Sequence, residues 1–168
     1  MDAEQLRTLQ APLKQRYRDQ PEAALITLSA TGTLDTASVS CKVDTGRALV
    51  QAGLHPATGG TGLEICSGDM LLEALVACAG VTLRAVATAL DIPVRSGRVS
   101  AEGDLDFRGT LGVSKEVPVG FGKIRLHFDL DTEATAEQLA TLLRLTERYC
   151  VVLQTLRTPP DLSVAFTT

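Results

Sequence analysis

The stretch DMLLEALVACAGVTLRAVATAL, which begins at Asp69, constrains the fold of this chain more than any other segment. It is rich in strong helix formers, and its apolar residues recur at helical spacing. Ser67 is the expected N-cap, and the aspartate after it suits the first turn. Pro93 ends the pattern, because its ring clashes with a continuing helix. The sequence therefore predicts one long helix over about residues 69–91, with Cys78 near its middle.

The segments around this helix alternate in the manner of strands. In residues 23–53, the run VSCKV alternates apolar and polar residues, DTGR supplies a turn and ALVQA returns, which predicts a hairpin. RVSAEGDLDFR and KIRLHFDLD alternate as well, and GTLGVSKEVPVGFG between them is expected to be a long loop or distorted hairpin. The side chains expected to face the core are Val99, Ala101, Leu105, Phe107, Ile124, Leu126, Phe128 and Leu130.

Two further helices are expected. Residues 2–19 are mostly helix formers, interrupted or kinked by Pro12. A second long helix runs over about residues 135–157, capped by Thr135, with Cys150 on its core-facing stripe, and PPDLSVAFTT ends the chain as a short strand. This order predicts an α+β fold with helices packed on an antiparallel sheet. The 168 residues fit a single domain, 1–168, in which residues 1–20 form an N-terminal helical extension.

Charge and composition exclude several functions. The net charge is −4 and no Lys/Arg cluster appears, which argues against nucleic-acid binding. The N-terminus is charged throughout, unlike a secretory signal, and no apolar run has the roughly 18 residues of a membrane helix. We therefore expect a cytoplasmic protein that binds neither nucleic acid nor membrane.

Cysteine is the residue type with the most chemical promise. Four cysteines, at positions 41, 66, 78 and 150, form no CxxC pair and no zinc-ligand pattern, and there are only two histidines. Neither a metal site nor a bound cofactor is expected. Because structural disulfides are rare in the cytoplasm, any cysteine chemistry here should be redox or nucleophilic.

The pattern alone leaves two interpretations of Cys78 and Cys150 open. Each lies on a core-facing stripe, where a free cysteine often serves as a small apolar filler. Alternatively, two long helices that each turn a thiol inward form a redox pair, and the small residues around Cys78 in ALVACAG would let other groups approach its sulfur. A working thiol must ionise. Cys78 is too far along its own helix for that dipole to help, so a cation from elsewhere in the fold is expected.

Three stretches resemble one known family. SGDMLLEALVACAGVTLRAVA is similar to the central helix of the OsmC/Ohr family of osmotically inducible and organic hydroperoxide resistance proteins, in which an acidic residue precedes the first active cysteine by nine or ten positions. GDLDFRGTLG and VPVGFGKIRLHFDLD resemble the strands that follow. ERYCVVLQTL resembles the second cysteine motif. Together the three cover roughly residues 36–168.

The resemblance implies a thiol peroxidase. In the family, the first cysteine attacks an organic hydroperoxide, the second resolves the sulfenic acid as a disulfide, and a small dithiol such as dihydrolipoamide restores the thiols. Cys78 would then be peroxidatic and Cys150 resolving. Arg47, in DTGRALV, matches the family's hairpin arginine, and Asp69 takes the carboxylate position nine residues before Cys78. The implied fold is an intertwined homodimer of antiparallel sheets around long central helices, with the active site near the subunit interface.

The sequence departs from the family pattern at both motifs. SGDML stands where the family has Asn-Pro-Glu-Glu-Leu, and the proline and serine of the second motif are replaced, so that Val151 follows Cys150 directly. These changes favour an alternative, a catalytically weak or inactive relative that binds a small apolar molecule. A redox sensor that uses the same disulfide is a further alternative.

Several other residues have ordinary interpretations beside a functional one. Arg47 is typical of a solvated turn, and Asp69 of a favourable charge at a helix start. Glu73 is a reserve carboxylate that would by default face solvent. Cys66 lies in the loop before the helix, where it is incidental or competes as a resolving thiol. Three further expectations complete the set: Cys41 packs in a strand, His127 lies on the surface, and His55 is a possible ligand or base without an evident partner.

Overall fold

The computed structural model of the chain describes residues 3–34, 41–43, 52–63 and 65–166. Its helices are α1 (Ala3–Asp19), α2 (Ser67–Ala89), α3 (Phe107–Thr110), α4 (Ala136–Tyr149) and α5 (Val151–Arg157), with short 3-10 helices η1 (Pro21–Ala24) and η2 (Pro56–Thr58). Its strands are β1 (Leu25–Leu34), β2 (Cys41–Val43), β3 (Ala52–Gly53), β4 (Ile65–Cys66), β5 (Ser96–Asp106) and β6 (Phe121–Asp131).

Four of the strands form one antiparallel sheet in the order β2-β1-β5-β6, and β3 and β4 form a small parallel pair. The alternating runs predicted as strands are β5 and β6, which pair along nearly their whole length. The pairing shifts register between Asp104 and Leu105. Gly103 lies beside this irregularity, and a Cβ there would meet the Phe121 ring at 2.5 Å, so a side chain at this position would displace that ring.

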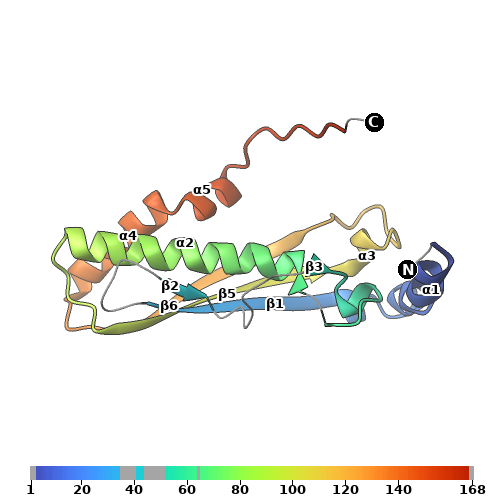
Figure 1. Cartoon of the computed structure of the whole chain (residues 1–168), viewed down its shortest axis with the longest axis horizontal. Coiled ribbons are helices and arrows are strands. Elements are labelled where there is room, and N and C mark those ends of the chain that lie inside the picture. Colours follow the sequence, from blue (N-terminus) through green and yellow to red (C-terminus); the bar gives the residue numbers. More distant parts are fainter. Residues whose placement is uncertain (1–2, 35–40, 44–51, 64, 167–168) are drawn as a thin grey trace.

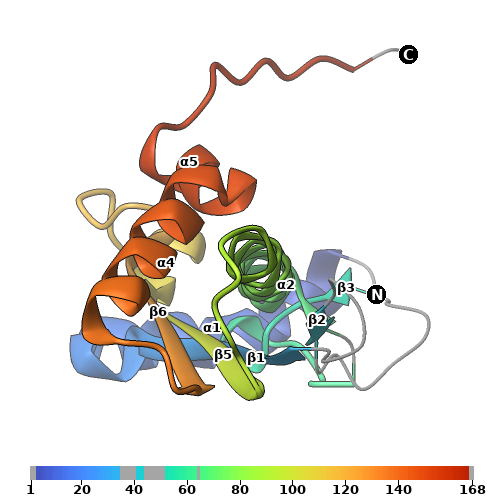
Figure 2. The ribbon, with the colours of Figure 1, turned by 90° about the vertical axis from the view of Figure 1, so that its left-hand side faces the viewer.

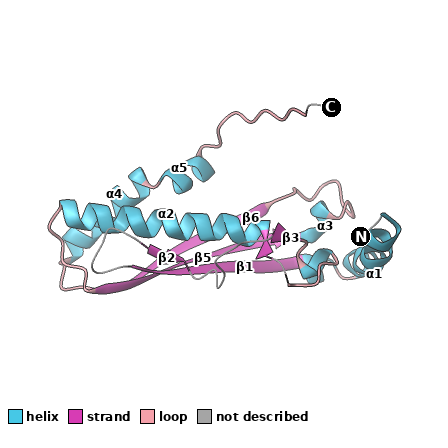
Figure 3. Cartoon of the chain, viewed as in Figure 1, coloured by secondary structure: helices cyan, strands magenta, loops and turns pink. Residues whose placement is uncertain are grey.

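A single long helix covers one face of the sheet. Figure 1 and Figure 2 show α2 lying along the sheet, with α4 and α5 beside it and α1 at one end. Figure 3 shows that α4 and α5 lie on the same side of the strands as α2. The core between α2 and the sheet is made by the buried side chains of Leu72, Leu75, Val76, Ala79, Leu83, Ala87, Val99, Ala101 and Leu105. The predicted α+β arrangement of helices on an antiparallel sheet is confirmed.

Helix α2 has the length and apolar composition of a membrane span, and among the helices that the structure describes it alone does. The prediction that no segment of the chain meets this criterion was therefore wrong. In the fold, its buried stripe packs against β1 and β5, as the core helix of a sheet protein does. This packing accounts for part of the apolar composition of α2, since 44% of its apolar window is buried.

The predicted helix over residues 135–157 is two helices. Thr135 caps α4 as expected, and it forms a capping box with Gln138. At Cys150 the backbone leaves helical geometry, with φ −71° and ψ 104°, and α5 starts again at the next residue. Cys150 is therefore a junction between two helices, which the uninterrupted apolar stripe in the sequence does not reveal.

Other sequence predictions need correction as well. Helix α1 runs through Pro12 without interruption. The N-cap of α2 is Cys66 and not Ser67, and its sulfur accepts a hydrogen bond from the backbone N–H of Gly68 at 3.4 Å. The C-terminal segment is an extended chain that projects from the body and pairs with no described strand, so a terminal strand is not formed (Figure 1).

The predicted hairpin around DTGR lies largely outside the described residues. The structure describes β2, just before this turn, and β2 pairs with β1. Leu34 of β1 is opposite Cys41. Phe107 also differs from expectation, because it starts α3 and is buried there rather than continuing the strand face.

Candidate active site

Cys78 and Cys150 come together where the α4–α5 junction meets the middle of α2. Cys78 is partly buried at the border of the buried stripe of α2, whereas Cys150 is fully buried. Both are free thiols. The Cys150 thiol donates a hydrogen bond to the Cys78 sulfur. The two sulfurs lie close together, as expected, but Cys150 lies at a break between two helices and not within one long helix.

The Cys78 sulfur lies in a ring of hydrogen-bond donors. Burial raises the pKa of its thiol, but the donors outweigh burial, and the pKa lies below its ordinary value. In decreasing order of effect, the donors are the backbone N–H of Val152, the Cys150 thiol, the Thr82 hydroxyl and the backbone N–H of Val151. The cation expected from the sequence is thus not needed to lower this pKa, because backbone N–H groups at the start of α5 face the sulfur.

Cys150 has the opposite tendency. Burial, followed by the hydrogen bond to Cys78 and the charge of its thiolate, raises the pKa of Cys150 to about 11, against opposing backbone N–H groups of Leu153 and Val152. Cys78 therefore ionises more readily than an ordinary cysteine, and Cys150 less readily. The hydrogen bond from the protonated Cys150 favours the thiolate of Cys78 over its thiol.

The position of α5 is fixed by contacts with α4 across the junction. Arg157 of α5 forms an ion pair with Glu147 of α4 at 2.9 Å. Gln154 donates a side-chain hydrogen bond to the Glu147 carbonyl at 2.6 Å. These contacts hold the first turn of α5, and with it the N–H groups of Val151 and Val152, beside the thiols.

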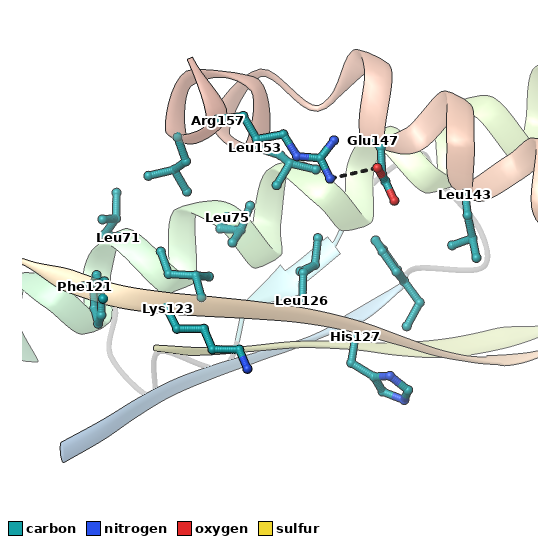
Figure 4. Close-up of a pocket in the computed structure, with 14 residues that line it drawn as sticks. Leu71, Leu75, Phe121, Lys123, Leu126, His127, Leu143, Glu147, Leu153 and Arg157 are labelled. Atoms are coloured by element: carbon teal, nitrogen blue, oxygen red, sulfur yellow. Dashed lines mark hydrogen bonds and ion pairs between the residues drawn. The ribbon is translucent and has the colours of Figure 1, made fainter. Parts of the chain in front are cut away.

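A cavity of about 800 Å³ lies between α2, α4, α5 and β6. Figure 4 shows Leu71 and Leu75 reaching toward it from α2, Leu153 and Arg157 from α5, and Phe121 and Leu126 from β6. Leu75 lies one turn before Cys78 and Leu153 one turn after Cys150, but neither cysteine lines the cavity. The ion pair of Glu147 and Arg157 lies along its edge (Figure 4).

Asp69 is not part of this cluster. It lies nine residues before Cys78, which is about 13 Å along a helix at 1.5 Å per residue, at the N-terminal end of α2. There it faces His55, and burial raises its pKa while the histidine opposes the rise. The pKa of neighbouring Glu73 is also raised, by burial and then by the charge of Asp69.

His55 has a partner that the sequence did not reveal. Its ring stacks on Phe107, with centroids 4.8 Å apart, and its Nδ1 accepts the backbone N–H of Ala57 at 3.0 Å. Because Nδ1 is an acceptor, the neutral ring carries its hydrogen on Nε2. Burial lowers the pKa of His55, and Asp69 opposes this. A buried hydrogen bond from the Tyr17 hydroxyl to the Ala57 carbonyl, at 2.7 Å, fixes the same loop.

The structure describes only some of the remaining candidates. Arg47 lies outside the described residues, as does the side chain of Cys41 in β2. Cys66 caps α2, and His127 is exposed on β6 as predicted. Within the described part of the chain, no three His, Cys, Asp or Glu side chains are grouped to hold a metal ion.

Thr82 and the first residues of α5 are the site groups that sequence reasoning missed. Thr82 shares a helix face with Cys78 at a spacing of four, which was a usable signal. The donors Val151 and Val152 had none, since no glycine or proline marks the break at Cys150.

The fold and the paired thiols define a class of α+β protein in which a long central helix presents one cysteine to a second on the C-terminal helices. Residues 60–165 match the family model described as OsmC-like protein, and the chain belongs to this family. No curated protein matches it significantly in sequence. Among solved structures, it resembles an OsmC-like hydroperoxide resistance protein from Jannaschia sp. CCS1, with a TM-score of 0.61 and 16% identity over 86% of this chain and 95% of that one.

Proposed function

We propose that this protein is a thiol peroxidase that reduces organic hydroperoxides, with Cys78 as the nucleophile. The observation that carries the proposal is the pairing of two hydrogen-bonded thiols whose pKa values shift in opposite directions. A nucleophilic cysteine must be a thiolate near neutral pH, and a resolving cysteine must wait until the first has reacted. The opposite pKa shifts of the pair favour both conditions.

The proposed reaction balances with no group beyond the substrate and a dithiol. The Cys78 thiolate attacks one peroxide oxygen, an S–O bond forms as the O–O bond breaks, and the alkoxide leaves as an alcohol after taking a proton. The sulfur is oxidised by two electrons to a sulfenic acid. Cys150 then loses its proton and attacks the Cys78 sulfur, and the S–O bond breaks to release water. A dithiol such as dihydrolipoamide reduces the resulting disulfide by exchange.

The order of these steps follows from the electrostatics of the pair. The thiolate of Cys78 raises the pKa of Cys150 through its hydrogen bond and its charge. Oxidation of Cys78 to a neutral sulfenic acid removes both effects. The pKa of Cys150 then falls, so the resolving thiol becomes more nucleophilic after the first step than before it.

We also propose that the working form is a homodimer and that Arg47 and Asp69 act at its interface. Asp69 is too far along α2 to touch Cys78 of its own chain, so a second protomer would have to bring it there. Exposed apolar side chains near the thiols support a subunit contact, since Tyr149 is 56% and Val151 70% exposed.

Turnover with tert-butyl or cumene hydroperoxide and a dithiol tests the peroxidase directly. We expect turnover in the wild-type protein and none in Cys78→Ser, while Cys66→Ser retains it because Cys66 caps a helix start away from the pair. Disulfide mapping after one equivalent of peroxide should find Cys78 joined to Cys150. Absence of turnover with several dithiols, together with an unoxidised Cys78 by mass spectrometry, would refute the proposal.

The apolar cavity favours a second candidate, a small-molecule binding protein whose thiols are inactive. Its volume of about 800 Å³ and its leucine and phenylalanine lining suit an alkyl ligand. Native mass spectrometry of the purified protein, before and after denaturing extraction, distinguishes the two. A retained lipid together with unreactive thiols would favour binding.

A further inference from the structure

The Thr146 hydroxyl is an anomaly beside the thiol pair. Thr146 is 1% exposed, and its Oγ1 has no hydrogen-bond partner among the atoms that the structure describes. A buried hydroxyl without a partner costs about 1–3 kcal/mol, and most such groups in proteins are satisfied. Thr88 of α2 shows the usual solution, because its hydroxyl donates to the Arg84 carbonyl one turn earlier, at 2.8 Å.

Its place in the fold connects this hydroxyl with the sulfurs. Thr146 lies one turn before Cys150, and the backbone N–H of Cys150 donates to the Thr146 carbonyl at 2.9 Å. Leu142, Thr146 and Cys150 form the fully buried stripe of α4 and its junction, and this helix packs on α2. The hydroxyl is therefore buried about 6 Å along the helix from the sulfur that contacts Cys78.

A valine has the same shape as threonine and would fill this buried position without an unsatisfied hydroxyl. Oxidation of Cys78 would place a strong hydrogen-bond acceptor on the sulfur that Cys150 contacts. We propose that the Thr146 hydroxyl is the hydrogen-bond donor for the oxygen that Cys78 acquires on oxidation. The inference rests on the proposed peroxide chemistry and adds a residue to it.

The hydroxyl acts on a defined step. In the sulfenic acid, Thr146 O–H donates to the oxygen bonded to the Cys78 sulfur. When Cys150 attacks, the S–O bond breaks and negative charge develops on that oxygen, which leaves as water after taking a proton. A hydrogen bond to this oxygen strengthens as the charge grows, so it stabilises the transition state more than the sulfenic acid.

Thr146→Val tests this role, because it removes the hydroxyl and keeps the shape of the side chain. Reduced wild-type and variant proteins receive one equivalent of cumene hydroperoxide, and disulfide formation is followed by rapid quenching and mass spectrometry. We expect Thr146→Val to form the Cys78–Cys150 disulfide about tenfold more slowly, as loss of one hydrogen bond to a charged oxygen implies. Thr146→Ser should restore the rate, and Thr88→Val should leave it unchanged.

Thermal unfolding of the reduced proteins separates this role from a structural one. Because the hydroxyl has no partner before oxidation, Thr146→Val should unfold at the wild-type temperature or above it. A wild-type rate of disulfide formation in Thr146→Val would overturn the inference alone, as would a lowered unfolding temperature. Failure of the wild-type protein to form the disulfide would overturn the proposed peroxidase together with it.

Discussion

The thiol of Cys150 donates a hydrogen bond to the sulfur of Cys78, and this contact shifts the pKa values of the two groups in opposite directions. Cys78 is the acidic member because N–H groups of α5 also face it, and Cys150 is the basic member because it is buried against a thiolate. The proposed division of roles between a nucleophile and a resolving thiol would therefore already be present in the reduced protein.

Removal of the Cys150 thiol should raise the pKa of Cys78. We expect Cys150→Ala to shift the pH dependence of Cys78 alkylation to higher pH, because a hydrogen-bond donor to the thiolate is lost. Cys150→Ser is the matched control, since its hydroxyl can still donate. The measurement is the rate of iodoacetamide modification of Cys78 against pH, followed by mass spectrometry. Identical profiles for the two variants would contradict the expected role of the donor.

Thr82→Val should also raise the pKa of Cys78, because it removes another hydrogen-bond donor to the sulfur. Its hydroxyl lowers the pKa of Cys78, so its loss should leave less thiolate at pH 7 and slow alkylation several-fold. Thr88→Val removes a hydroxyl from the same helix that bonds only to the backbone. Equal rates in the two variants would exclude a specific effect of Thr82.

Acid should destabilise the fold partly through His55. Burial lowers its pKa in the folded state below the value of about 6.5 in the unfolded chain, so the unfolded state binds more protons in this range. The free energy of unfolding should therefore fall as the pH falls from 7.5 through 6.5. Urea titrations at pH 7.5 and 5.5 should show a smaller loss in His55→Gln, whereas His127→Gln, at an exposed site, should behave as the wild type does.

Leu142→Ala should destabilise the packing of α4 on α2. Leu142 is fully buried, and truncation of a buried leucine costs about 2–5 kcal/mol through lost transfer energy and a residual cavity. Leu162→Ala, in the projecting C-terminal segment, removes a side chain that is 85% exposed and should change the free energy of unfolding little. Chemical denaturation of both variants checks the difference, which an equal loss in the two would contradict.

The C-terminal segment should contribute to the proposed dimer. Leu162, Val164 and Phe166 are 85%, 97% and 89% exposed, which is unusual for three alternating apolar residues. Truncation after Thr158 removes them without touching a described helix or strand. Light scattering after size exclusion should show more monomer in the truncated protein at equal concentration. An unchanged mass distribution would exclude this segment from the contact.

The sequence predicted the elements with strong periodicity and missed those defined by a single residue. The segments that form α2, β5 and β6 are recognisable in the sequence by the spacing of their apolar residues. The resemblance of the cysteine motifs correctly predicted that Cys78 and Cys150 are neighbours. No glycine, proline or polar cluster marks the break at Cys150 in the sequence. The break depends on tertiary packing and on the contacts of Glu147 with α5. The thiolate-stabilising N–H groups depend on that break, so they were beyond sequence reasoning.

The carboxylate of Asp69 shows the opposite case. Its spacing from Cys78 suggests a shared site, but a helix converts nine residues into about 13 Å, and the nearby partner of Asp69 is His55 from a distant loop. Sequence spacing shows that two residues share a helix, but it does not show whether their side chains can touch. Only the stack of His55 on Phe107 and its bond to Ala57 bring that ring to the start of α2.

The break between α4 and α5 places a possible hinge beside the thiol pair. A cysteine within a continuous helix could approach another sulfur only by bending many hydrogen-bonded residues together. At Cys150 a change in two backbone torsions would move the seven-residue α5 as one body once its contacts with Glu147 are released, while α2 and the sheet stay in place. Formation and reduction of a disulfide would then move only α5, at the edge of the molecule, and the core between α2 and the sheet would not be strained.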